Sequence, residues 1–97
     1  MIRHVVLFSA RRPADVETIA RTLRGYSEIP GVQALEVGLN RRSDPLSDEA
    51  DVVLTALFAD DAALAAYKAH PIYLAGIAAI RPLRDMRIAA DFVVGAG

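Results

Sequence analysis

The chain has 97 residues, of which 54% are hydrophobic, and its formal net charge is −1. A near-neutral charge argues against a nucleic-acid partner, because such binding needs an uncompensated basic face. The sequence has no cysteine, which excludes disulfides, thiolate metal sites and cysteine nucleophiles and favours a cytoplasmic location.

Residues 1–97 are expected to form one domain without a membrane-spanning segment or a signal peptide. No apolar run reaches the ~18 residues that cross a bilayer. The N-terminus lacks an apolar region followed by a small-residue cleavage site. A domain this small buries only a modest core, so part of its large hydrophobic content should lie at the surface. A second copy of the chain is the simplest way to cover that surface.

Residues 2–8 are predicted to form the first strand, because the run is rich in β-branched and aromatic side chains. Apolar side chains fall on both faces of this strand, so both faces should be covered. Pro13 can begin the helix that follows. One face of this helix carries an apolar stripe at i, i+3, i+4 and i+7, made of Val16, Ile19, Ala20 and Leu23.

The remaining predicted elements are two strands, two helices and a last strand, at residues 32–39, 51–58, 62–69, 71–80 and 86–94. The two helices separate at His70, because Pro71 disfavours helical geometry in the residue before it. The resulting order, β-α-β-β-α-β, is that of an α+β ferredoxin-like fold, an antiparallel sheet with helices on one face. The other face would carry aliphatic side chains, which predicts a homodimer formed by sheet-on-sheet packing.

Short motifs spread over nearly the whole chain carry a family resemblance. They are residues 2–8, 29–32, Gly38, Asn40, 50–54, Phe58, Asp60, Leu64, Tyr67, His70, Pro71 and 91–92. In this order and spacing they resemble the stress-responsive dimeric α/β-barrel (Dabb) family. The resemblance implies a ferredoxin-like protomer whose sheet joins that of a second copy to form a dimeric α/β barrel.

The best-understood members of that family are plant polyketide cyclases, which close a linear tetraketide by aldol condensation without a cofactor. They use a tyrosine and a histidine as a pair. The resemblance places Tyr67 at the tyrosine position, but Tyr73 at the position of the catalytic histidine, so their central base is absent here. His4 matches a histidine on the first strand of their pocket, and His70 matches the family's His-Pro histidine rather than the catalytic one.

His4 and Tyr67 are therefore the candidate catalytic pair. Imidazole titrates near neutral pH, so His4 can move a proton, and the Tyr67 hydroxyl can polarise a carbonyl. Each also has a structural interpretation, as a core histidine bonded to a nearby acceptor or a core tyrosine with a satisfied hydroxyl. The sequence shows no second group that orients His4. Catalysis by the pair needs both groups to reach one ligand atom, roughly 3 Å from each.

The candidate ligand-binding residues are Val6, Phe8, His70, Tyr73 and Arg87. His70 has an alternative role in satisfying free backbone groups at the junction of the two helices. Arg87 can lie at the rim of a pocket and hold an anion, or it can form a salt bridge. Asp91 is expected to pair with either Arg3 or Arg87. A metal site would need both histidines and carboxylates to converge, so no metal and no other cofactor is expected.

Three functions stay open on this sequence. The first is a homodimer that binds a small apolar or aromatic molecule in a cavity between sheet and helices. The second is a cofactor-free enzyme, similar to a polyketide cyclase, an isomerase or a monooxygenase, that uses Tyr67 and His4. The third is a stress-associated structural oligomer without a ligand, favoured if Tyr67 and Phe8 close the interior. An RNA-recognition role is excluded, because the third strand offers only Phe58 for stacking.

Overall fold

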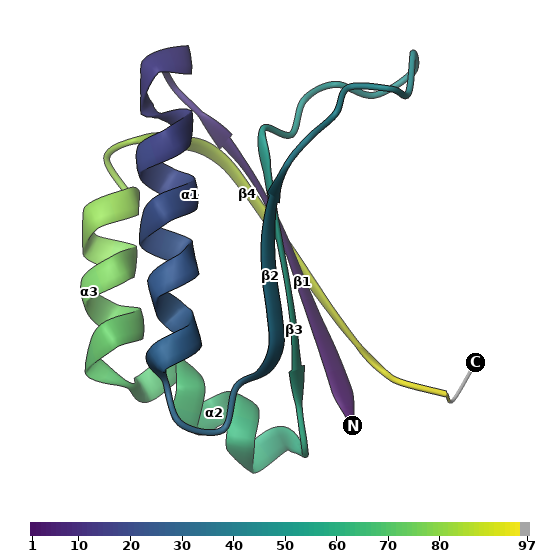
Figure 1. Cartoon of the computed structure of the whole chain (residues 1–97), viewed down its shortest axis with the longest axis vertical. Helices are drawn as coiled ribbons and strands as arrows, with labels where there is room; N and C mark the ends of the chain where they lie inside the picture. The colour runs from purple at the N-terminus through teal and green to yellow at the C-terminus, as the bar shows by residue number, and fades with distance from the viewer. Residues whose placement is uncertain (96–97) are drawn as a thin grey trace.

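The computed structural model describes residues 1–95 as a four-stranded antiparallel sheet with helices on one face (Figure 1). The strand order is β2-β3-β1-β4, so the predicted ferredoxin-like fold is confirmed. Short 3₁₀ turns, η1 (Pro13–Asp15) and η2 (Gly25–Glu28), flank the first helix. The strands and helices are β1 (Ile2–Ala10), α1 (Val16–Arg24), β2 (Gln33–Leu39), β3 (Val52–Phe58), α2 (Asp61–Ala69), α3 (Pro71–Ile80) and β4 (Arg84–Val93).

The junction between α2 and α3 lies at His70, as predicted. His70 is extended, with φ −70° and ψ 141°, and Pro71 occupies the first turn of α3. Both α2 and α3 have a side-chain N-cap. Asp60 accepts a hydrogen bond from the Ala63 amide of α2 at 2.9 Å, and His70 Nδ1 accepts one from the Ile72 amide of α3 at 3.1 Å.

The core lies between the sheet and the helices, because alternate residues of the two central strands point toward the helices. The β1 and β3 side chains on this face are buried, as is the apolar stripe of α1. The main contributors are Val6, Phe8, Ile19, Ala20, Leu23, Val52, Leu54, Ala56 and Phe58.

An irregularity in the pairing of β1 with β4 changes the direction of one side chain. Phe8 lies opposite Arg87 and Ala10 opposite Arg84, so β4 holds one extra residue between the two pairs. Ser9 supports this bulge, since its hydroxyl accepts a hydrogen bond from the Met86 amide at 2.9 Å. As a result β4 begins at Arg84, two residues before the predicted start.

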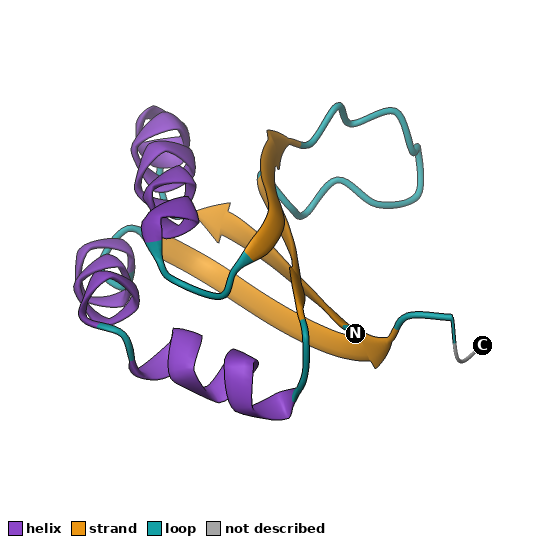
Figure 2. Ribbon diagram, turned by 60° about the horizontal axis from the view of Figure 1, so that its bottom comes forward, coloured by secondary structure: helices purple, strands orange, loops and turns teal. Residues whose placement is uncertain are grey.

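No helix covers the opposite face of the sheet in the part of the chain that the structure describes (Figure 2). Val5 and Leu7 of β1 lie on this face, and Ile88 and Phe92 of β4 are 54% and 52% exposed there. We call these four residues the open apolar face. It matches the sequence-based expectation of an uncovered aliphatic surface.

Within residues 1–95, no single helix is long and apolar enough to cross a membrane; α2 and α3, bent by 61°, pass such a test only when taken together.

Candidate functional site

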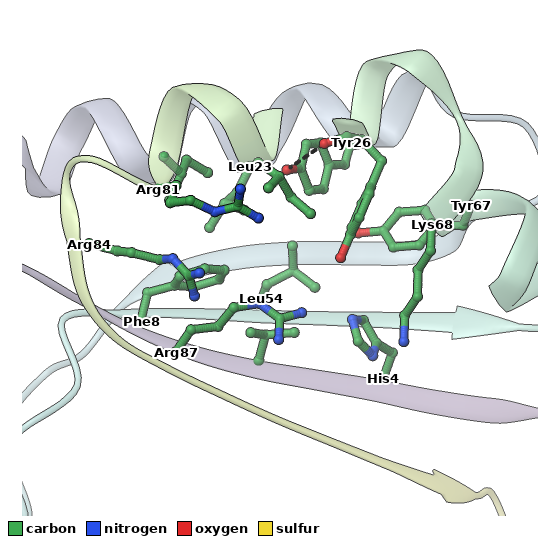
Figure 3. A pocket seen from close by; sticks show the side chains of 14 residues that line it. His4, Phe8, Leu23, Tyr26, Leu54, Tyr67, Lys68, Arg81, Arg84 and Arg87 are labelled. Carbon is green, nitrogen blue, oxygen red and sulfur yellow. Dashed lines mark hydrogen bonds between the residues drawn. The ribbon is translucent and has the colours of Figure 1, made fainter. Parts of the chain in front are cut away.

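A cavity of about 380 Å³, partly open to solvent, lies between the sheet and the helices (Figure 3). The sheet contributes apolar and aromatic side chains and one histidine to its wall. The helices and η2 contribute three tyrosines and three aliphatic side chains, and four cationic side chains complete the lining. The lining residues are His4, Val6, Phe8, Leu54; Leu23, Tyr26, Tyr67, Tyr73, Ile77, Ile80; and Lys68, Arg81, Arg84, Arg87.

Six of the seven candidate residues line this cavity. The predicted catalytic pair, His4 and Tyr67, lies side by side in it, with ring centroids 6.1 Å apart and ring planes at 71°. The other four are Val6, Phe8, Tyr73 and Arg87. His70 does not line it, because its ring caps α3 instead, which is the structural role considered above.

Asp91 is the group that orients His4. Its Oδ1 lies 2.5 Å from His4 Nδ1, and the His4 side chain is only 1% exposed. The antiparallel register of β1 and β4 places the two residues directly opposite each other. The expectation that Asp91 pairs with Arg3 or Arg87 is therefore wrong; Arg3 lies opposite Phe92, and its side chain points to the other face of the sheet.

The His4–Asp91 pair leaves one ring nitrogen available. A carboxylate only accepts hydrogen bonds, so His4 Nδ1 carries the proton that it donates to Asp91. Within residues 1–95, the His4 Nε2 has no hydrogen-bond partner. It also keeps some access to solvent, because every fully buried side-chain nitrogen in these residues has a partner. Nε2 can therefore accept a proton or a hydrogen bond from a molecule in the cavity.

Three tyrosines form the aromatic wall above His4. The Tyr67 ring centroid lies 5.9 Å from that of Tyr26 and 5.0 Å from that of Tyr73. Burial raises the pKa of Tyr67 and, aided by the neighbouring Tyr73 hydroxyl, raises the pKa of Tyr26 to about 12. Both phenols therefore stay protonated at neutral pH, and Tyr67 is a hydrogen-bond donor rather than a base.

Tyr26 was not among the predicted site residues, although the sequence holds a signal for it. It follows Leu23 by three residues and so continues the apolar stripe of α1 into η2. Its hydroxyl donates to the Tyr73 carbonyl at 3.4 Å, which ties η2 to α3.

The cationic residues Lys68, Arg81 and Arg84 were also missed. In Figure 3, the Arg81 and Arg84 side chains lie at one end of the cavity and His4 lies toward the other end, with the Arg87 guanidinium between them. Strict alternation along β4 would put Arg84 and Arg87 on opposite faces of the sheet. The bulge beside Ser9 brings both to the cavity face, and no local sequence pattern reports this.

The acidic and histidine side chains do not form a metal centre within residues 1–95, where no group of three or more of them is placed to hold an ion.

Comparison with known families agrees with this fold. The chain matches the Dabb family, the stress responsive A/B barrel domain, over residues 2–94, and it belongs to this family. No functionally curated protein matches it significantly.

Solved structures share the fold over nearly the whole chain. A dimeric ferredoxin-like protein of unknown function from Thermobifida fusca is 26% identical, with a TM-score of 0.82 over 96% of this chain and 90% of that one. A Dabb family protein from Mesorhizobium loti is 25% identical, with a TM-score of 0.77 over 95% and 94%. SnoaB, a cofactor-independent oxygenase from Streptomyces nogalater, is 22% identical, with a TM-score of 0.74 over 99% and 94%.

Proposed function

We propose that this protein is a homodimer that binds a small apolar or aromatic molecule in the cavity between sheet and helices. The observation that carries the proposal is the cavity of about 380 Å³, with apolar and aromatic walls and with the His4 Nε2, the Tyr67 hydroxyl and four cationic side chains as polar groups. A concave, mostly apolar site with a few converging polar groups is typical of small-molecule binding. A structural oligomer with a closed interior fits this cavity less well.

A blocked cavity tests the proposal. Ile77 of α3 lines the cavity, so Ile77→Trp should fill it. Ile72 lies on the same helix but is 36% exposed and does not line the cavity, so Ile72→Trp is the matched control. Aromatic fragments that raise the melting temperature of the unaltered protein should lose this effect in Ile77→Trp and keep it in Ile72→Trp. Equal binding by both variants would place the ligands elsewhere and refute the proposal.

The geometry of His4 favours a second function, cofactor-free catalysis by proton transfer. Nε2 of a histidine held by Asp91 can take a proton from a carbon next to a ligand carbonyl. The bond electrons move to the carbonyl oxygen, and the resulting enolate accepts a hydrogen bond from the Tyr67 hydroxyl. SnoaB, a neighbour with this fold, is described as a cofactor-independent oxygenase, and this supports a reaction without a cofactor.

Solvent deuterium exchange tests the catalytic proposal. Ketone-containing fragments that bind the cavity should exchange the C–H beside their carbonyl, as measured by NMR in D₂O. Asp91→Asn and Tyr67→Phe should each slow the exchange by about 100-fold, the usual size of a general acid–base contribution. Asp85→Asn, an exposed change on the same strand, should leave it unaltered. Exchange that is equally fast in Asp91→Asn would exclude the His4–Asp91 pair as the base.

A further inference from the structure

Within the described residues 1–95, the arginines that line the cavity have no acidic partners. Arg81, Arg84 and Arg87 all line the cavity, together with Lys68. Ion pairs within residues 1–95 join His4 to Asp91, Arg12 to Asp15 and Arg42 to Asp51, and none involves a cationic residue of the cavity. Like charges gathered around one hollow repel each other, so their arrangement favours an added negative charge.

The backbone of β4 places Arg84 and Arg87 on the same face of the sheet, the one that lines the cavity. The extra residue of β4 turns Arg84 to the side on which Arg87 lies, and the Ser9 hydroxyl holds that bulge through the Met86 amide. Bulges commonly redirect a side chain toward a functional site. Arg84 and Arg87 are also half-buried, so their guanidinium groups are less hydrated than those of fully exposed arginines.

The charge of Arg87 acts inside the cavity. It lowers the pKa of Tyr26 and of Tyr67, in opposition to the larger effect of burial. An anionic group held by Arg87 would therefore lie within electrostatic range of the tyrosine hydroxyls. One molecule can then contact the arginines and, toward the other end of the cavity, the His4–Tyr67 pair (Figure 3).

We propose that the molecule bound in this cavity carries an oxyanion, a carboxylate or a phosphate, which Arg84 and Arg87 hold with the help of Arg81. The rest of the molecule is apolar or aromatic and extends along the cavity toward His4 and Tyr67. Guanidinium groups suit this role because their paired N–H donors match the oxygens of carboxylates and phosphates. The proposal rests on the binding function proposed above and adds the chemical class of the ligand.

Three probes of similar shape and different charge test the proposal: 2-naphthoate, 2-naphthyl phosphate and the neutral 2-naphthamide. Calorimetry on the intact protein should show at least roughly tenfold tighter binding of one anion than of the amide. In Arg84→Gln/Arg87→Gln this preference should vanish. Arg21→Gln/Arg24→Gln, exposed changes on α1 that alter the net charge equally, should keep it.

The outcomes separate this inference from the proposed function. Tighter binding of naphthoate identifies a carboxylate ligand, and tighter binding of the naphthyl phosphate identifies a phosphate. If the amide binds as well as both anions, the inference is overturned while the cavity function stands. If no probe binds up to millimolar concentration, both are rejected.

Ser9→Ala gives an independent check of the role of the bulge. Removal of the hydroxyl frees the Met86 amide and should reduce the preference for the anion, since Arg84 loses its fixed direction. If Ser9→Ala lowers only the melting temperature and leaves the anion preference intact, the bulge does not position the arginine.

Discussion

At the scale of single residues, the buried phenol of Tyr26 links stability to alkaline pH. Burial and the nearby Tyr73 raise its pKa to about 12, above the ordinary value of 10.0. Between these two values the unfolded chain releases the phenolic proton while the folded chain keeps it. The unfolded state then binds fewer protons, so the free energy of unfolding falls as pH rises. Below pH 10 the Tyr26 phenol is protonated in both states, so its full contribution to the free energy of unfolding is present there.

Tyr26→Phe should therefore make the protein less sensitive to alkaline pH. The full effect of one such phenol is at most about 1.4 kcal/mol per pH unit. This pH dependence can be measured by urea unfolding of the unaltered protein and of Tyr26→Phe. The range from about pH 9 to about pH 11.5 covers roughly the window set by the two pKa values. The difference between the two proteins should be constant below pH 10 and shrink above it. A constant difference throughout would show that Tyr26 ionises equally in both states.

The role of His70 can be decided at the same scale. Its Nδ1 caps α3, so His70→Ala should lower the free energy of unfolding by about 1 kcal/mol. His70→Asn keeps a short acceptor and should recover most of that loss. Fragment binding in the cavity should be the same in both variants, because His70 does not line it. Weaker binding in the well-capped His70→Asn would restore the ligand-binding role expected from the sequence.

At the scale of elements, the close approach of α3 to η2 depends on a glycine. A Cβ added at Gly76 would lie 2.3 Å from the ring of Tyr26, which is itself only 3% exposed. A methyl group at this position must push the tyrosine ring out of place. The wall of three tyrosines would then lose its packing, although the helix itself would gain from an alanine.

Gly76→Ala is accordingly predicted to destabilise the protein. Overpacking of a buried site costs about 1–3 kcal/mol, whereas the gain in helix propensity is about 1 kcal/mol, so the clash should dominate. Gly25→Ala is the control, because a Cβ there meets nothing within 4 Å and Gly25 has φ −63°. Thermal unfolding should show a clear loss for Gly76→Ala and none for Gly25→Ala. A stabilised Gly76→Ala would mean that Tyr26 moves without cost.

The elements themselves could be predicted from the sequence because their signals are local. The apolar period of α1 and the effect of Pro71 on His70 each depend on residues a few positions apart. The His4–Asp91 pair could not be found in this way. It joins positions 87 residues apart, and only the register of β1 against β4 brings them together.

The same limit explains why Arg84 was missed although Arg87 was predicted. A rule of strict alternation assigns Arg84 and Arg87 to opposite faces of a strand, and a single extra residue reverses that assignment. A hydrogen bond joins Ser9 and Met86 at this bulge, and the two residues lie on different strands. A local pattern identifies a strand, but the direction of each side chain depends on how that strand pairs.

At the scale of the whole molecule, each face of the sheet serves a different proposed role, ligand binding on one and dimer formation on the other. The helix-covered face builds the cavity, and the open apolar face is the surface that we propose for the contact with a second copy of the chain. The relative from Thermobifida fusca is described as dimeric, which supports a dimer here. A sheet face with Ile88 and Phe92 each more than half exposed is a large apolar surface for so small a monomer.

Phe92→Glu should therefore convert the dimer into a monomer. The Phe92 side chain lies on the open apolar face, and a carboxylate there would be buried in the proposed contact without a partner, which is strongly unfavourable. Leu46→Glu is the matched control, because Leu46 is 91% exposed and lies in the loop between β2 and β3, away from the open apolar face. Light scattering at micromolar concentration should give the mass of two chains for the unaltered protein and Leu46→Glu, and of one chain for Phe92→Glu. A Phe92→Glu dimer would place the contact on another surface, and an unaltered protein that is already monomeric would reject the dimer altogether.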